Sequence, residues 1–205
     1  MLPVITIARQ YGSDGRDVGE MLAKRLEIPF YDKALIAMAA KQSGLSEEVF
    51  ADADEKATSS LLYSMVMGSY AFGARIPGVN EMPINDKLFI IQSDIIKKAA
   101  AEGPCVVVGR CADYILREHE NCLNVFIHAD KAYRVRRAVE LGDCEAKRAP
   151  DFVTKKDKQR ANYYNFYSNK RWDDLQNYDM VLDTSRFTVE QCVDLLEVAV
   201  KQLAK

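Results

Sequence analysis

Five short apolar runs are spaced along the chain, and longer stretches with helical periodicity separate most of them. Their residues are continuous rather than alternating in apolar character, which is typical of strands that are covered on both faces of a parallel sheet. We therefore predict a five-stranded parallel sheet. The predicted strands are residues 4–8, 29–31, 105–108, 124–128 and 180–183.

Two of the separating stretches have a clear helical repeat. After the first strand, Val18, Leu22 and Leu26 recur at a spacing of one helical turn. The end of the chain repeats this pattern with Val189, Val193, Leu196 and Val200. Buried strands that alternate with amphipathic helices predict an α/β fold in three layers, with a doubly wound sheet.

Two polar segments interrupt the alternation. Residues 43–86 are rich in Met, Ala and Ser and then in Gly and Pro, which predicts helices and a long loop inserted between strands. Residues 142–171 are polar and basic, and we expect them to form a lid-like segment. No linker separates either segment from the remainder, so we expect a single domain over residues 1–205.

The overall composition is that of a globular protein. Apolar residues make up 48% of the chain and charged residues 28%. The apolar runs are too short to cross a bilayer, and no basic segment followed by an apolar one opens the sequence. We therefore expect a cytoplasmic protein without a membrane partner. The five cysteines include no C-x-x-C pair, which favours free thiols over a zinc site.

The net charge of −2 conceals a basic block. Residues 131–171 contain 12 Lys and Arg against 5 Asp and Glu, whereas the remainder is acidic. Such a block is typical of a solvated helical face, and it also suits a surface that closes over a polyphosphate. Since the chain as a whole is not basic, we expect no nucleic-acid partner.

The loop after the first strand is the strongest candidate for chemistry. A loop of this kind between a strand and a helix can direct backbone N–H groups at phosphate oxygens, although a plain strand-to-helix turn would give a similar pattern. It departs from the G-x-x-x-x-G-K-[ST] motif, with Gln10 for the first Gly, Arg16 for Lys and Asp17 for Ser or Thr. The candidate phosphate-binding residues are Gly12, Ser13, Asp14, Gly15, Arg16 and Asp17.

This loop resembles the degenerate P-loop of the cytidylate kinase-like family, and three later stretches support the resemblance. Residues 107–110 with Asp113 are similar to the G-R-D element of cytidylate kinases. Residues 126–130, followed by Arg134, Arg136 and Arg137, resemble a strand of these kinases and the helix that enters their lid. Residues 181–185 resemble the last strand and the turn that follows it. The likeness covers almost the whole chain outside residues 42–86.

The resemblance implies an ATP-dependent phosphotransferase that uses magnesium and moves the γ-phosphate to a nucleoside monophosphate or a similar small phosphate acceptor. ATP would bind at residues 12–17. Asp32 would lie near the magnesium ion and the acceptor. The acceptor would also meet Arg110 and Asp113, and the cations that offset charge on the transferring group would be Arg16, Arg134, Arg137 and Arg160.

The residues leave several alternatives open. Asp32 can equally serve as a helix N-cap, and Arg110 can pair with Asp113 instead of a phosphate. Lys33 and Met38 stand where cytidylate kinases have Ser and Arg, so the acceptor is not identified; Arg75 is a weak candidate to replace that Arg.

Two other function classes compete with the kinase. The carboxylate of Asp17 beside the loop cation suggests an inactive nucleotide-binding or regulatory module. The aromatic residues near the basic block could stack on nucleic-acid bases, although aromatic residues at helical spacing more often belong to a core. They are Tyr163, Tyr164, Phe166 and Tyr167. The oligomeric state is left open, with a homodimer as one option.

Overall fold

The computed structural model describes residues 1–32 and 84–204 of the chain. The chain divides into two compact units, one made of Met1–Asp32 and Ile96–Lys205 and the other of Lys33–Ile95. The first unit contains the whole sheet. The predicted insert lies outside the described residues up to residue 83, and so do Lys33, Met38 and Arg75.

The sheet has five parallel strands in the order β2-β3-β1-β4-β5, which confirms the predicted fold class. Four of the observed strands differ from the predicted runs by one or two residues at an end, and the fifth coincides. The strands are β1 (Val4–Arg9), β2 (Phe30–Tyr31), β3 (Val106–Val108), β4 (Cys122–His128) and β5 (Met180–Asp183).

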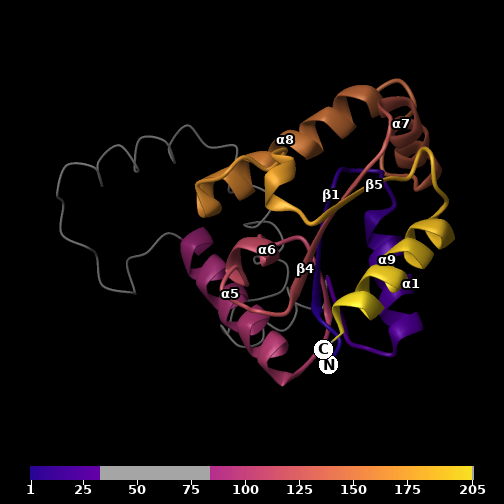
Figure 1. The fold of residues 1–205 in the computed structure, drawn as a ribbon. Helices are drawn as coiled ribbons and strands as arrows, with labels where there is room; N and C mark the ends of the chain where they lie inside the picture. Colours follow the sequence, from indigo (N-terminus) through magenta and orange to yellow (C-terminus); the bar gives the residue numbers. More distant parts are fainter. Residues whose placement is uncertain (33–83, 205) are drawn as a thin grey trace, which may run out of the picture. The chain divides into compact units, whose positions relative to one another are not determined.

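Helices cover both faces of this sheet. Helix α1 (Gly15–Leu26) and helix α9 (Val189–Leu203) lie side by side on one face (Figure 1). Helix α6 (Ala112–Ile115) and the C-terminal end of α5 (Ile84–Glu102) lie on the other. The predicted apolar stripes point into the core, where Val18, Leu22, Val193, Leu196 and Val200 pack against the strands.

Two helices connect β4 to β5. Helix α7 (Lys131–Glu140) and helix α8 (Ala149–Ser168) pack against each other, and the short 3-10 helix η2 (Leu175–Asn177) precedes β5. Most of the predicted lid-like segment is therefore helix α8. Tyr164 on α8 is buried, and Trp172 packs edge-on against Phe126 with ring centroids 5.3 Å apart.

In the described part of the chain, no helix is both long enough and apolar enough to cross a membrane. Because all five strands are parallel, their carboxyl ends lie at one edge of the sheet, and ligands of open α/β sheets bind beyond this edge. The connections that leave β1, β2, β3 and β4 at this edge contain the residues predicted for the site.

Candidate phosphate-binding site

A buried serine, Ser13, fixes the loop between β1 and α1 through hydrogen bonds. The hydroxyl of Ser13 donates to the carbonyl oxygen of Gln10 at 2.9 Å and lies 3.2 Å from that of Ile127. The carbonyl oxygen of Ser13 in turn accepts from the hydroxyl of Thr184 at 2.9 Å. These bonds tie the loop to the ends of β4 and β5.

Gly12 brings the loop against the backbone of α7. Its φ of 71° lies in the left-handed region. A Cβ added at Gly12 would lie 2.6 Å from the carbonyl oxygen of Arg134, closer than real Cβ atoms approach. The position therefore requires glycine for two reasons, its backbone conformation and its contact with α7.

The loop presents a row of backbone N–H groups at the N-terminus of α1. The N–H groups of residues 12–17 have no acceptor among the described residues, and the first helical bond of α1 runs from Val18 to Asp14 at 2.9 Å. The unpaired N–H groups at a helix N-terminus attract anions. The preceding amide, that of Tyr11, instead donates to Asp157 on α8 at 2.7 Å.

Guanidinium groups gather around Asp32 at the adjoining strand ends. Arg16 donates through Nε to Asp32 at 2.9 Å and through Nη1 to Glu20 at 2.7 Å. Nη2 of Arg9 lies 3.8 Å from the other carboxylate oxygen of Asp32. Arg160, which the sequence predicted as a cation of this site, donates to the carbonyl oxygen of Arg9 at 2.9 Å.

Arg9 is a member of this cluster that the sequence reasoning missed. It is the last residue of β1, and its guanidinium lies over Gly109, where an added Cβ would be 2.1 Å from Nη1. The sequence feature that could have identified Arg9 is an arginine at the carboxyl end of a buried strand. Arg110 carries the same signal, since it also follows a buried strand.

Burial and mutual repulsion disfavour the charged forms of several of these groups. Burial, and then the repulsion of Arg160, lowers the pKa of Arg9 to about 9. Burial also lowers the pKa values of Arg110 and Arg160, and Asp32 acts in the opposite direction on all three. An anion bound here would favour the charged forms, because it would add to the attraction of one carboxylate.

Asp32 is the residue expected to approach a magnesium ion. Within residues 1–32 and 84–204, no group of three or more His, Cys, Asp or Glu side chains could hold a metal by itself. Magnesium in phosphoryl-transfer sites is usually held by one or two carboxylates together with substrate phosphates. A single carboxylate beside a phosphate site therefore fits this mode of binding.

Arg110 and Asp113 follow β3 in a tight turn. Gly109, Arg110 and Cys111 have φ values of 78°, 59° and 56°. The carboxylate of Asp113 accepts from the hydroxyl of Tyr164 at 2.5 Å, and burial raises its pKa. The partner that the structure gives this carboxylate is thus Tyr164 on α8, whereas the sequence had raised Arg110 as a partner.

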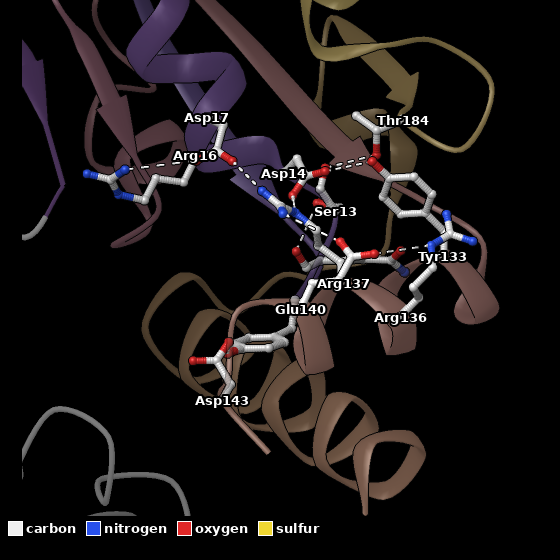
Figure 2. Close-up of polar contacts among 12 residues, drawn as sticks. Ser13, Asp14, Arg16, Asp17, Tyr133, Arg136, Arg137, Glu140, Asp143 and Thr184 are labelled. Carbon is white, nitrogen blue, oxygen red and sulfur yellow. Dashed lines mark hydrogen bonds and ion pairs between the residues drawn. The ribbon is translucent and has the colours of Figure 1, made fainter. Parts of the chain in front are cut away.

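Arg134 and Arg137 contact the loop but not Asp32. Arg134 is buried and donates to the carbonyl oxygen of Ala129 at 2.9 Å and to Asp157. Arg137 donates to Asp14 at 2.5 Å and to Asp17 at 3.2 Å. Figure 2 shows Arg16 extending away from the side of the loop on which Arg137 lies.

A pocket of about 180 Å³ lies on the side of the loop that faces Arg137, and the guanidinium groups around Asp32 do not line it. Tyr133 and Arg137 line it together with the carboxylate of Asp14. The remaining lining residues are Arg136 and Glu140, which come from the same helix.

A parallel five-stranded sheet with helices on both faces, and a glycine-containing loop between the first strand and the first helix, defines the α/β fold of P-loop kinases. The chain belongs to the cytidylate kinase-like family, whose model matches residues 4–186. The resemblance drawn from the loop and the three later stretches is thereby confirmed.

Individual relatives agree with this assignment. A cytidylate kinase from Methanosarcina barkeri (strain Fusaro / DSM 804) is 30% identical over 103 residues, which are 48% of this chain and 55% of that protein. The match thus spans about half the length of the curated relative.

Solved structures extend the likeness to the full fold. An uncharacterized protein from Eubacterium ventriosum ATCC 27560 is 25% identical, with a TM-score of 0.70 over 97% of this chain and 98% of the other. Shikimate kinase from Bacteroides thetaiotaomicron shares the fold at 14% identity, with a TM-score of 0.54 over 98% and 99% of the two chains.

Proposed function

We propose that the protein is an ATP-dependent phosphotransferase that moves the γ-phosphate of ATP to a nucleoside monophosphate or a similar small phosphate-bearing acceptor. The observation that carries the proposal is the set of guanidinium groups around Asp32, next to a loop whose backbone N–H groups have no acceptor within residues 1–32 and 84–204. Family membership supports the same reaction class, because the matching relative is a cytidylate kinase.

ATP would bind at the loop. The N–H groups of residues 12–17 offer donors to the phosphate oxygens, and the N-terminus of α1 favours their negative charge. Arg16 supplies a cation beside these donors. The bonds of Ser13 hold the loop backbone in place, so little reorganisation is needed when the phosphates bind.

Asp32 would hold the magnesium ion. Magnesium, when bound, neutralises charge on the transferring phosphates. In the free protein Arg9 and Arg16 offset the charge of the Asp32 carboxylate. This carboxylate can also orient the acceptor phosphate.

The acceptor phosphate would bind among Arg9, Arg110 and Arg160. Each of these side chains has a pKa lowered by burial, and a phosphate dianion would stabilise their charged forms. Phosphate transfer then requires mainly that donor and acceptor are aligned and that the charge on the equatorial oxygens of the transferring phosphoryl group is stabilised. The protein contributes fixed cations and fixed donors.

The inactive-module alternative was motivated by the carboxylate of Asp17, which would repel phosphate. In the structure Arg137 donates to this carboxylate at 3.2 Å and so reduces its repulsion. We therefore prefer the kinase, and binding of ATP without transfer to any acceptor would favour the module.

The test is phosphate transfer by the purified full chain with ATP, magnesium and a panel of nucleoside monophosphates. We expect transfer to at least one acceptor. We expect Arg16→Ala to reduce kcat/KM about a hundredfold, since the charge it supplies acts on the phosphates. Arg117→Ala, at an exposed arginine outside the site, should keep the wild-type rate. Equal rates for Arg16→Ala and wild type would refute the assignment of the loop.

A further inference from the structure

The phosphate-binding loop contains two carboxylates, an unusual feature for an anion site. Asp14 directly precedes α1 and Asp17 lies in its first turn. Both lie within residues 12–17, whose backbone N–H groups have no acceptor in the part of the chain that the structure describes. A carboxylate in this place is attracted by the same helix N-terminus that would attract a phosphate, and it repels a bound polyphosphate.

Helix α7 donates to both carboxylates. The hydroxyl of Tyr133 donates to one oxygen of Asp14 at 2.6 Å, and Nε of Arg137 donates to the other at 2.5 Å. Nη2 of Arg137 donates to Asp17 at 3.2 Å. One guanidinium therefore bridges both acidic side chains of the loop (Figure 2).

The position of α7 is fixed against the loop independently of these side chains. The carbonyl oxygen of Arg134 lies only 2.6 Å from the place a Cβ of Gly12 would take, so the helix backbone and the loop backbone are in contact. Asp14 is almost fully covered, with 7% of its side chain exposed. Arg137 thus approaches a pair of carboxylates whose places are set by backbone packing.

We infer that Arg137 is a positioning residue: it holds Asp14 and Asp17 on the α7 side of the loop and offsets their charge, so that the N–H groups remain available to a polyphosphate. This inference rests on the proposed function. It assigns Arg137 to the loop carboxylates, whereas the family resemblance implied a cation on the transferring phosphate.

The two roles predict different behaviour when the carboxylates are neutralised. If Arg137 acts on Asp14 and Asp17, removing their charges makes Arg137 dispensable for binding. If Arg137 contacts the phosphates directly, its loss weakens binding whether or not the carboxylates are charged. The comparison is a double-mutant cycle between Arg137 and its two partners.

The experiment measures the dissociation constant of ATP and of inorganic tripolyphosphate by titration calorimetry, using the full chain. For Arg137→Met we expect affinity to fall about tenfold, because a carboxylate no longer paired lies next to the phosphates. The matched control is Arg136→Met, the neighbouring arginine, which is exposed and pairs with Glu140. Adding Asp14→Asn and Asp17→Asn to Arg137→Met should restore affinity to the wild-type level or above.

Two outcomes would overturn the inference: unchanged affinity in Arg137→Met, or weak binding that the two Asn substitutions do not restore. If Arg137→Met fails to fold, Arg137→Gln replaces it, and adding Asp14→Asn and Asp17→Asn to that variant must restore the affinity for tripolyphosphate. Wild-type protein that binds tripolyphosphate but phosphorylates no acceptor would refute only the proposed function. Wild-type protein that binds no polyphosphate would refute both.

Discussion

Arg9 places a guanidinium over Gly109, 3.8 Å from Asp32, at the carboxyl end of the central strand. Its surroundings disfavour its charge, since burial and Arg160 both lower its pKa, to about 9. A bound anion would stabilise the charged form of a guanidinium in such a place. The titration of Arg9 therefore provides a direct test in solution of whether this site binds an anion.

We expect the affinity for tripolyphosphate to fall as the pH rises through about 9. The sign follows from the lowered pKa: below this value Arg9 is charged in the free protein and attracts the anion, and above it the charge must first be restored. Calorimetric titrations from pH 7.5 to about 10.5 measure the change.

Arg9→Met is the control for this pH dependence, because it keeps an apolar stem and removes the titrating group. It should bind more weakly than wild type at neutral pH and lose most of the dependence near pH 9. Profiles of the same shape in the two proteins would show that another group titrates.

At the scale of elements, the ends of β4 and β5 support the loop after β1. The turn after β5 is stabilised by Asp183, which accepts from the backbone N–H of Ser185 at 2.9 Å. This turn places the hydroxyl of Thr184 against the carbonyl oxygen of Ser13. A second threonine, Thr188, begins α9 with a capping box that it forms with Gln191.

The two threonines are expected to differ in their effects on ligand binding. Thr184→Val removes the donor to the buried carbonyl oxygen of Ser13, so it should destabilise the protein by about 1–3 kcal/mol and weaken tripolyphosphate binding. Thr188→Ala should cost about 1 kcal/mol as a lost helix cap and leave the affinity unchanged. Denaturant unfolding and calorimetry measure the two quantities, and equal affinities in the two variants would contradict the proposed support of the loop.

At the scale of the whole molecule, the candidate site gathers side chains from distant parts of the chain. Arg9 and the α8 residue Arg160 are separated by 151 positions, and the guanidinium of Arg160 donates a hydrogen bond to the backbone carbonyl oxygen of Arg9. Bringing several guanidinium groups together opposes folding, and a bound polyphosphate would reverse this effect. The stability of the unit that contains the sheet should therefore depend on the ligand.

We expect tripolyphosphate to raise the melting temperature. At a concentration a hundred times the dissociation constant, the stabilisation should be about 2.7 kcal/mol. Arg9→Met should melt at a higher temperature than wild type without ligand and show a smaller shift with it. Sodium chloride at matched ionic strength controls for screening, and a lower melting temperature for ligand-free Arg9→Met would contradict the expected repulsion.

The sequence alone determined the strands, the covering helices and the position of the glycine-containing loop between β1 and α1. The continuous apolar run of residues 105–108 predicts a buried strand because both faces of this strand are covered, and this property can be recognised from the local sequence. The order of the loop and three further stretches was enough to place the chain in its family. Asp32, Arg16 and Arg160 were also predicted to share a site, and the structure brings them together.

The pairing of charges was decided only by the tertiary structure. Arg9 enters the site because β3 lies beside β1, so that Gly109 makes room for its guanidinium. Arg137 meets Asp14 and Asp17, and Asp113 meets Tyr164, because packing of α7 and α8 fixes these neighbours. Periodicity along a chain reports which residues are buried. Which cation meets which carboxylate depends on strand order and helix packing, since these contacts join residues more than fifty positions apart.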